Sequence, residues 1–145
     1  MNNNYNYYRE NDYRFNNYQR NMDNPMLFNE QEGYMKGNMF RNLYSPYGNY
    51  QIPILKPTSK QEKMFLDMAE ASFAAHDINL YLDLYPNDGN MLELFNKYRE
   101  KANELTFVYE KEYGPIILSS SSLNTSPFLW QTQSFPWNVG GVSNV

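Results

Sequence analysis

The side chains of this chain that are best able to do chemistry are a single histidine and the carboxylates near it. His76 is the only histidine among the 145 residues, and Glu70, Asp77 and Asp83 follow or precede it closely. A metal centre needs several ligands that converge on one point, but helical spacing directs Asp77 away from His76. A ferritin-like di-metal site needs Glu-x-x-His on two helices, and the residue three before His76 is Phe73. We therefore predict no metal site and no cofactor.

The remaining polar residues do not form a known catalytic pattern. Four serines, 119–122, have no base near them in the sequence and are typical of a linker. The chain has no cysteine, no Gly-x-Ser-x-Gly motif, no P-loop and no dinucleotide fingerprint. Asp77 and Asp83 are an alternative pair of catalytic carboxylates, but residues six apart do not share one helical face. We predict that the protein is not an enzyme.

Asp77, Asn79 and Asp83 are polar residues within an otherwise apolar run. Short polar side chains in such positions are usually hydrogen-bonded or solvated. We expect them to form hydrogen bonds at a helix corner or to lie at a solvated edge, with recognition of a ligand or partner as the alternative. His76 falls on the apolar face of the same run, where we expect a buried or partly buried imidazole.

Two long helices joined at a proline are the elements that must position these side chains. Ser59 begins a capping-box pattern, Ser-x-x-Glu, before a long apolar run without glycine or proline. Pro86 stops that run, and Asp88 can cap the helix that follows. The predicted fold class is all-α, an antiparallel αα-hairpin with helices over residues 59–85 and 88–113 and extended, largely irregular N- and C-terminal arms.

The apolar positions of both helices predict where the core lies. We expect the first helix to bury its main stripe, which recurs at spacings of three and four and has a second apolar row beside it. The main stripe is Phe65, Ala69, Phe73, His76, Leu80 and Leu84, and the second row is Met64, Met68, Ala71, Ala75, Ile78 and Leu82. The second helix has a heptad-like seam of Met91, Phe95, Tyr98, Ala102, Leu105 and Tyr109. These faces are wider than one neighbour covers, so we expect a homo-oligomer or an obligate partner.

Composition divides the chain into four parts. Residues 1–24 are mostly Asn, Tyr and Arg, and with so few aliphatic side chains we expect a disordered segment. Three interpretations of this segment stay open: a solvated tail, an assembly arm and, third, an RNA-binding arm. Residues 25–57 contain short apolar anchors among many Gly and Pro residues, which predicts extended segments with turns. Residues 58–115 form the hairpin, and residues 116–145 form an aromatic tail without charged side chains.

Charge and hydropathy restrict the partners. The hairpin region has eleven acidic and six basic residues, and the whole chain has a formal net charge of −4. A nucleic-acid-binding surface is usually basic, so we expect no nucleic-acid partner. No apolar run approaches the roughly 18 residues of a membrane span, and the polar N-terminus has no secretory signal. We expect synthesis in the cytoplasm. We expect the uncharged tail to dock on a protein surface, because an exposed apolar tail favours aggregation.

Several short motifs of the hairpin carry a family resemblance. They are Phe73-Ala-Ala-His-Asp77, Ile78-Asn-Leu-Tyr-Leu-Asp83, Pro86-Asn-Asp88, Leu94-Phe-Asn-Lys-Tyr98 and Tyr109-Glu-Lys-Glu-Tyr-Gly-Pro115. In combination they resemble the bacterial spore coat protein family CotJB, over about residues 60–137. Phe135-Pro-Trp137 is similar to the family's Trp/Pro-rich ending, although Asn138 and Val139 stand where the family tends to have another Trp and an acid. More weakly, residues 37–57, with Gly37 to Tyr47, resemble the short companion protein CotJA.

The resemblance implies a non-enzymatic component of the spore coat, made in the mother-cell cytoplasm and associated with CotJC, a manganese-catalase-like coat protein. We accordingly expect a structural protein that packs through apolar hairpin faces and aromatic tails onto itself or onto such a partner. A small peptide- or nucleic-acid-binding adaptor with a disordered Asn/Tyr-rich arm is the alternative. The expected interaction residues are Phe40, Leu43, Tyr44, Phe73, Leu80, Phe95, Tyr98, Phe128, Trp130, Phe135 and Trp137.

Overall fold

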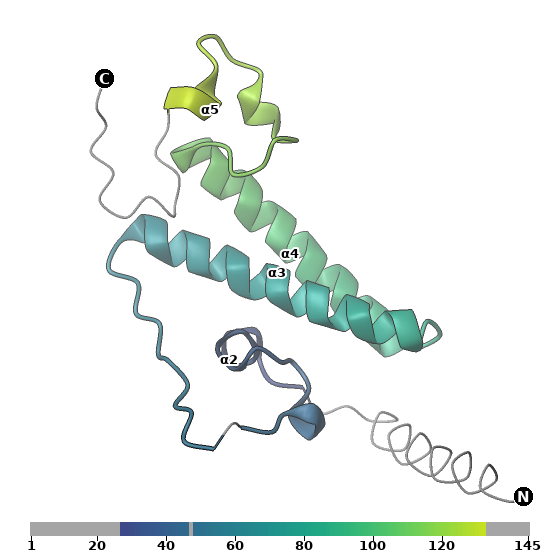
Figure 1. The fold of residues 1–145 in the computed structure, drawn as a ribbon. Coiled ribbons are helices and arrows are strands. Elements are labelled where there is room, and N and C mark those ends of the chain that lie inside the picture. Colours follow the sequence, from purple (N-terminus) through teal and green to yellow (C-terminus); the bar gives the residue numbers. More distant parts are fainter. Residues whose placement is uncertain (1–26, 47, 133–145) are drawn as a thin grey trace, which may run out of the picture.

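The computed structural model describes residues 27–46 and 48–132, and its elements are helical (Figure 1). Two long helices pack against each other as an antiparallel hairpin, with shorter elements before and after them. In chain order these elements are α2 (Glu30–Lys36), η1 (Arg41–Leu43), α3 (Lys60–Leu84), α4 (Gly89–Tyr113), η2 (Ser121–Leu123) and α5 (Leu129–Thr132). The predicted all-α hairpin is confirmed. The Asn/Tyr-rich arm, residues 1–24, and the tail anchors Phe135 and Trp137 lie outside the described residues.

Local signals determine where the two long helices begin. The Ser59 side chain accepts a hydrogen bond of 3.1 Å from the Glu62 amide, and the Glu62 carboxylate accepts one of 2.6 Å from the Thr58 amide. Asp88 accepts from the Met91 amide at 3.1 Å and from the Tyr81 hydroxyl at 3.0 Å. These bonds satisfy amide groups that a helix start leaves unpaired. Both helix starts are therefore as predicted to within one residue.

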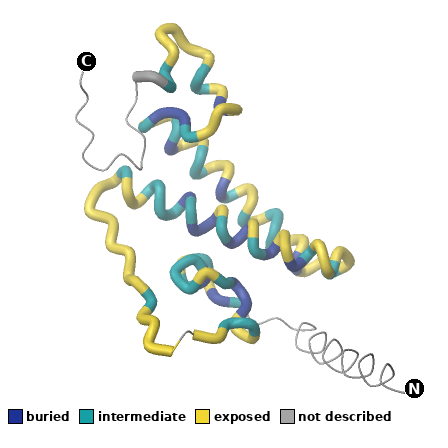
Figure 2. The backbone as a smooth tube through the Cα atoms, viewed as in Figure 1, coloured by how far each residue is buried: buried dark blue, intermediate teal, exposed yellow. Residues whose placement is uncertain are grey.

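The core of α3 lies mainly on the second of the two predicted apolar rows and not on the main stripe. Ile78 is fully buried, while Leu80 keeps 49% of its surface exposed and His76 is exposed. The buried positions of α3 include Ala71 and Ala75 of the second row, and α3 and α4 are in extensive contact. These short side chains allow two helix axes to approach closely. The expectation that Leu80, Leu84 and His76 belong to the core is wrong, and Figure 2 shows the exposed positions along the hairpin.

The seam of α4 agrees with its prediction. Met91, Ala102 and Tyr109 are buried, and the intervening Phe95 and Tyr98 are half-buried. The Tyr109 ring lies edge-on to Phe65 of α3, with 5.8 Å between ring centroids. Its hydroxyl accepts a hydrogen bond of 3.1 Å from the Gln61 side chain. Because the seam is an apolar row along a helix whose other positions are mostly polar or charged, it determines which face α4 buries.

Segment 27–46 contains a helix where we expected extended structure. Asn29 caps α2 by accepting from the Glu32 amide at 2.8 Å, and Gly37 ends it with a left-handed φ of 69°, a conformation that glycine adopts without strain. The chain then turns back, so that Leu27 and Phe40 form an isolated antiparallel bridge. Seven residues are too few to show a helical period, which is why the pattern of glycines misled the prediction. Residues 48–57 are irregular and mostly exposed.

The segment after α4 folds back onto the end of that helix. The Glu110 carboxylate accepts hydrogen bonds from the Ile116 amide at 3.1 Å and from the Ser120 hydroxyl at 2.6 Å. Helix α5 contacts η2, so the described part of the tail stays at this end of the hairpin. Its apolar residues Leu118 and Phe128 are exposed. In the described residues, no helix combines the length and the apolar character that crossing a bilayer requires.

Candidate interaction surfaces

The structure brings several of the predicted interaction residues together inside one chain. Phe40 is buried in a core cluster with Met39 of the N-terminal segment and Ile78 of α3. The partly buried residues packed against this cluster include Leu43, Phe73, Phe95 and Tyr98. These residues join segment 27–46 to the hairpin. A role for them in binding another chain stays a prediction.

Aromatic rings carry much of this internal contact. Phe40 stacks on Tyr81 with 5.3 Å between centroids, and Tyr81 lies against Tyr85 at 4.8 Å. Tyr34 of α2 lies edge-on to Phe73 of α3 at 5.8 Å. Such pairs contribute about 0.5–1.5 kcal/mol each beyond the area they bury. Segment 27–46 is thus a packed layer on the hairpin.

One carboxylate of the polar trio binds the N-terminal segment. Asp77 accepts a hydrogen bond of 2.7 Å from the Met39 backbone amide, 38 residues away in the sequence. Met39 itself is fully buried, so its amide has to find a partner in the protein. Asp77 therefore forms a hydrogen bond, but to segment 27–46 and not at the helix corner where we expected one. Asn79 and Asp83 are exposed.

Met39 is the residue that sequence reasoning missed. It lies in a Gly/Pro-punctuated stretch, and the only local signal was its place beside Phe40 in a short apolar anchor. Its amide partner, Asp77, lies on a helix whose face could not be assigned from spacing alone. Its side chain lies against Gly33 of α2, so closely that a Cβ at Gly33 would collide with the sulfur. Gly33 is thus needed for close packing at this point.

A charged cluster lies where α2, α3 and α4 meet. Lys101 of α4 forms an ion pair with Glu30 of α2. The hydrogen bond that Lys101 donates to the Glu30 carboxylate within this pair raises the pKa of Lys101. Glu70 of α3 is buried nearby. Burial raises the pKa of the Glu70 carboxyl, and the neighbouring Asp67 carboxylate raises it further, while Lys63 lowers it. The ionised form of Glu70 is therefore costly in the folded protein.

Replacing Glu70 by Gln should stabilise the protein at neutral pH. Because the pKa of Glu70 is raised on folding, the unfolded chain loses its proton first as the pH rises, and stability falls through that range. Glu70→Gln removes this loss. Urea midpoints of wild type and variant should coincide at acid pH, below the ordinary glutamate pKa, and diverge above it. Exposed Glu93 provides the control, since Glu93→Gln should leave the pH profile unchanged; a flat difference for Glu70→Gln would contradict the assignment.

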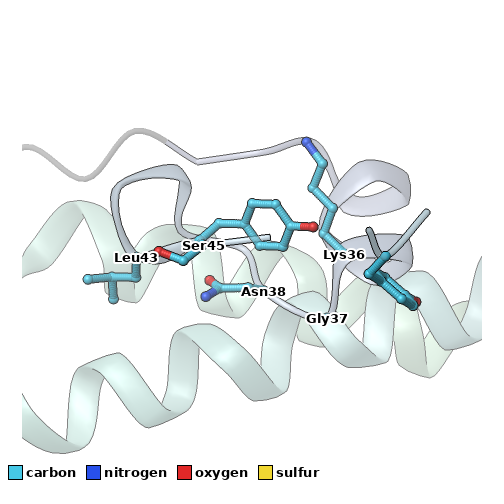
Figure 3. Close-up of a pocket in the computed structure, with 7 residues that line it drawn as sticks. Lys36, Gly37, Asn38, Leu43 and Ser45 are labelled. Atoms are coloured by element: carbon cyan, nitrogen blue, oxygen red, sulfur yellow. The ribbon is translucent and has the colours of Figure 1, made fainter. Parts of the chain in front are cut away.

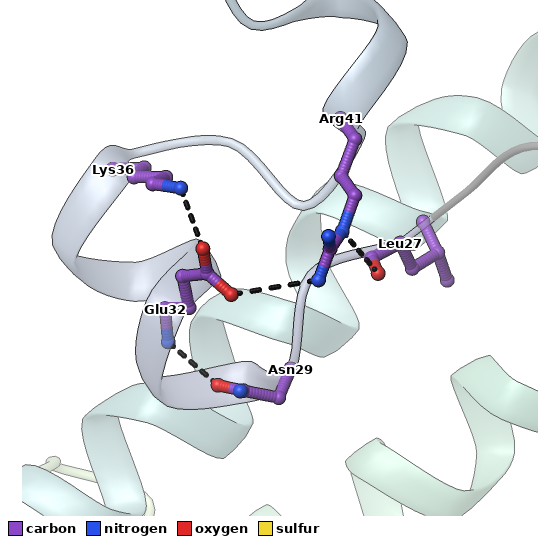
Figure 4. A network of polar contacts seen from close by, with 5 residues as sticks. All are labelled: Leu27, Asn29, Glu32, Lys36 and Arg41. Atoms are coloured by element: carbon purple, nitrogen blue, oxygen red, sulfur yellow. Dashed lines mark hydrogen bonds and ion pairs between the residues drawn. The ribbon is translucent and has the colours of Figure 1, made fainter.

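A polar network holds the N-terminal segment in shape (Figure 4). Glu32 binds Lys36 at 2.6 Å and Arg41 at 3.6 Å. The Arg41 Nε donates to the Leu27 carbonyl at 3.1 Å. The Phe28 ring lies within cation–π range of both cations, 3.8 Å from the Lys36 Nζ and 4.8 Å from the Arg41 guanidinium. Glu32, Lys36 and Arg41 therefore stabilise the fold of this segment, whereas Glu30 binds Lys101 of α4.

A shallow pocket of about 330 Å³ opens beside this network (Figure 3). It is lined by Lys36, Gly37, Asn38, Leu43, Tyr44, Ser45 and Tyr50. The predicted interaction residues Leu43 and Tyr44 form part of its wall. The lining includes no carboxylate or histidine to act as a general base, and Lys36 is already paired with Glu32. The pocket thus has the character of a surface hollow and not of a reaction site.

The candidate chemical residues do not converge in the described part of the chain. Among residues 27–46 and 48–132, no three His, Asp or Glu side chains lie close enough together to hold a metal ion. His76 and Asp83 are exposed, and Asp77 is occupied by the Met39 amide. Leu80 and Phe128 are exposed, and Trp130 is half-buried, so these interaction residues are distributed over separate surfaces.

Comparison with known proteins gives one match. A family model for the CotJB protein matches residues 62–138, which is just over half of the chain. The matched region begins in the first turn of α3, covers α4 and the described tail, and ends one residue after Trp137. The CotJA-like segment predicted at residues 37–57 lies outside it. No curated protein and no solved structure matches this chain.

Proposed function

The chain belongs to the CotJB family of spore coat proteins, and from this premise we propose that it is a non-enzymatic assembly component of the coat. In this proposal it packs through apolar hairpin surfaces and its aromatic tail onto other protein surfaces. Those surfaces are a second copy of itself or a manganese-catalase-like coat protein, the partner that the family resemblance implies.

The observation that carries the proposal is the amount of large apolar side chain left exposed after the chain has folded. Scattered single exposures are normal, but grouped ones mark interaction sites. Leu84 is 70% exposed at the corner between the helices, close in the chain to exposed Leu80 and Leu92. Other exposed apolar residues of the hairpin and tail are Phe107, Val108, Ile117, Leu118 and Phe128. A partner surface that covers these groups would gain hydrophobic stabilisation.

The uncharged tail supports the same proposal. Residues 116–145 have no charged side chain, and charged side chains are what usually keep an exposed segment soluble. We propose that the tail and the hairpin act in assembly together, while the Asn/Tyr-rich arm, residues 1–24, strengthens larger assemblies. In this division of the chain, the hairpin, residues 58–115, provides the folded body, and residues 27–46 of segment 25–57 pack on it.

Removing the aromatic anchors of the tail should release the protein from its complexes. In the variant, Phe128, Trp130, Phe135 and Trp137 are all replaced by Ser. Helicity should stay as in the wild type, because the buried core of the hairpin is made by residues of α3, α4 and segment 27–46, while copurification with coat proteins should fall severalfold. Native mass analysis of complexes isolated from sporulating cells measures both composition and stoichiometry.

A matched control replaces exposed apolar residues that lie outside the family match. Ile54→Ser with Leu55→Ser should leave copurification unchanged. A monomeric, well-behaved tail variant that still binds its partner would show that the tail is passive. Stoichiometric manganese or iron in the purified chain would overturn the non-enzymatic proposal itself.

A further inference from the structure

The outer face of α3 has a stripe of side chains that segment 27–46 and α4 leave partly open, although its first residue, Phe65, lies edge-on to Tyr109 of α4. The α3 outer stripe consists of Phe65, Ala69, Ser72, His76 and Leu80, which share one helical face. Phe65 and Ala69 are half-buried, and the other three are exposed.

We propose that the C-terminal segment of the same chain, residues 133–145, covers the α3 outer stripe, with Phe135 and Trp137 as its apolar anchors. The proposal goes beyond the coat function, because it concerns the free chain. Assembly in the coat would then have to displace this segment before its aromatic side chains reach another protein.

The C-terminal segment is long enough to reach the α3 outer stripe. An ion pair of 2.7 Å between Lys60 and Glu112 joins the start of α3 to the end of α4. At the same end of α4, the Ser120 hydroxyl donates a hydrogen bond to Glu110. The segment after Thr132 therefore starts at the end of the hairpin where α3 begins. Trp137 is five residues further, a span of about 17 Å. Ser72 is twelve residues beyond Lys60, about 18 Å along the helix axis.

The charges beside the stripe favour the C-terminal segment over a second copy of the chain. Exposed carboxylates flank the stripe, Glu62 near its start and Asp83 near its end. A second copy packed on the stripe would place carboxylates of the two chains together, in an antiparallel as well as in a parallel arrangement. Like charges in contact are unfavourable. Residues 133–145 have no charged side chain, so they can cover the stripe without this penalty.

The family match includes both the stripe and the two proposed anchors. It begins at Glu62, just before the stripe, and ends at Asn138, just after the second anchor. The residues proposed to meet therefore belong to one family pattern, although α4 and the described tail separate them in the chain.

Tryptophan fluorescence tests the contact in the full-length protein. The chain has two tryptophans, so Trp130→Phe leaves Trp137 as the single reporter. Trp137 should be shielded from acrylamide at submicromolar concentration, and Ser72→Glu should raise its quenching constant severalfold. Ser72 is exposed, so the charge should not disturb the core. Asn103→Glu, an equally exposed change on α4, is the control and should leave quenching unchanged.

Cysteine trapping provides a second measurement, since the natural chain has no cysteine. Ser72→Cys combined with Asn138→Cys should form a disulfide within one chain on mild oxidation, and Asn103→Cys with Asn138→Cys should form severalfold less. Three results would overturn the proposal: an unshielded Trp137 at all concentrations, shielding that appears only as concentration rises, or a disulfide that links two chains. The last two results identify a second copy as the occupant and leave the coat function standing.

Discussion

Ile78→Asp should abolish folding of the hairpin, whereas Leu80→Asp on the same helix should leave it folded. Ile78 is fully buried between α3, α4 and segment 27–46, while Leu80 keeps 49% of its surface exposed. An unpaired charge buried at position 78 costs several kcal/mol. That loss is comparable with the total stability of about 5–15 kcal/mol that small proteins have.

Far-ultraviolet circular dichroism and urea unfolding measure this pair directly. Leu80→Asp should shift the free energy of unfolding by no more than about 0.5 kcal/mol. Ile78→Val is the conservative control, with an expected cost of about 0.5–1.5 kcal/mol. If Leu80→Asp unfolded the purified chain as completely as Ile78→Asp, the face assigned to the core of α3 would be wrong.

Asp77→Ala should loosen the N-terminal segment while the two long helices stay formed. The substitution leaves the Met39 amide buried without an acceptor, because Met39 is fully buried and Asp77 is its hydrogen-bond partner at 2.7 Å. An unsatisfied buried donor costs about 1–3 kcal/mol. Segment 27–46 has few other hydrogen bonds or ion pairs to the hairpin, and the ion pair between Glu30 and Lys101 is the main one. We therefore expect local opening of this segment before global unfolding.

Hydrogen exchange at the Met39 amide measures the effect, and limited proteolysis in the exposed residues 48–57 provides a second readout. Exchange at Met39 should accelerate by about tenfold to a hundredfold, which corresponds to the expected loss. Asp83→Ala, an exposed carboxylate six residues along the same helix, should change neither readout. Asp77→Asn keeps an oxygen acceptor and should restore much of the protection. Unchanged exchange in Asp77→Ala would contradict the role of this bond.

The stability of segment 27–46 matters for the proposed function because it decides which surfaces remain for partners. The segment covers Phe73, Ala74 and Tyr81 on one side of α3. The large apolar groups left exposed include those at the helix corner, Phe107 and Val108 of α4, and several in the tail. Several residues predicted for binding, such as Phe40 and Phe95, pack within the chain, and a further role in binding another chain stays a prediction.

The sequence by itself determined the features that depend on neighbouring residues. The helix caps at Ser59 and Asp88, the corner at Pro86 and the seam of α4 are local, because a cap or a stop acts within one helical turn. The seam was readable because most other positions of α4 are polar or charged. The motifs of the hairpin were also sufficient to indicate the CotJB family, which the match over residues 62–138 confirmed.

Only the tertiary structure decided which face of α3 is inside and what segment 27–46 does. Helix α3 is apolar on several sides, so the spacing of its apolar residues is compatible with a core at Leu80 as well as at Ile78. In the structure the buried face includes Ile78, Ala71 and Ala75, and short side chains such as alanine allow close helix packing. Helix α2 is seven residues long, too short for a periodic pattern and held by contacts such as Asp77 with Met39, 38 residues apart. Long-range contacts of this kind have no local signature, because their energy depends on residues that only the folded chain brings together.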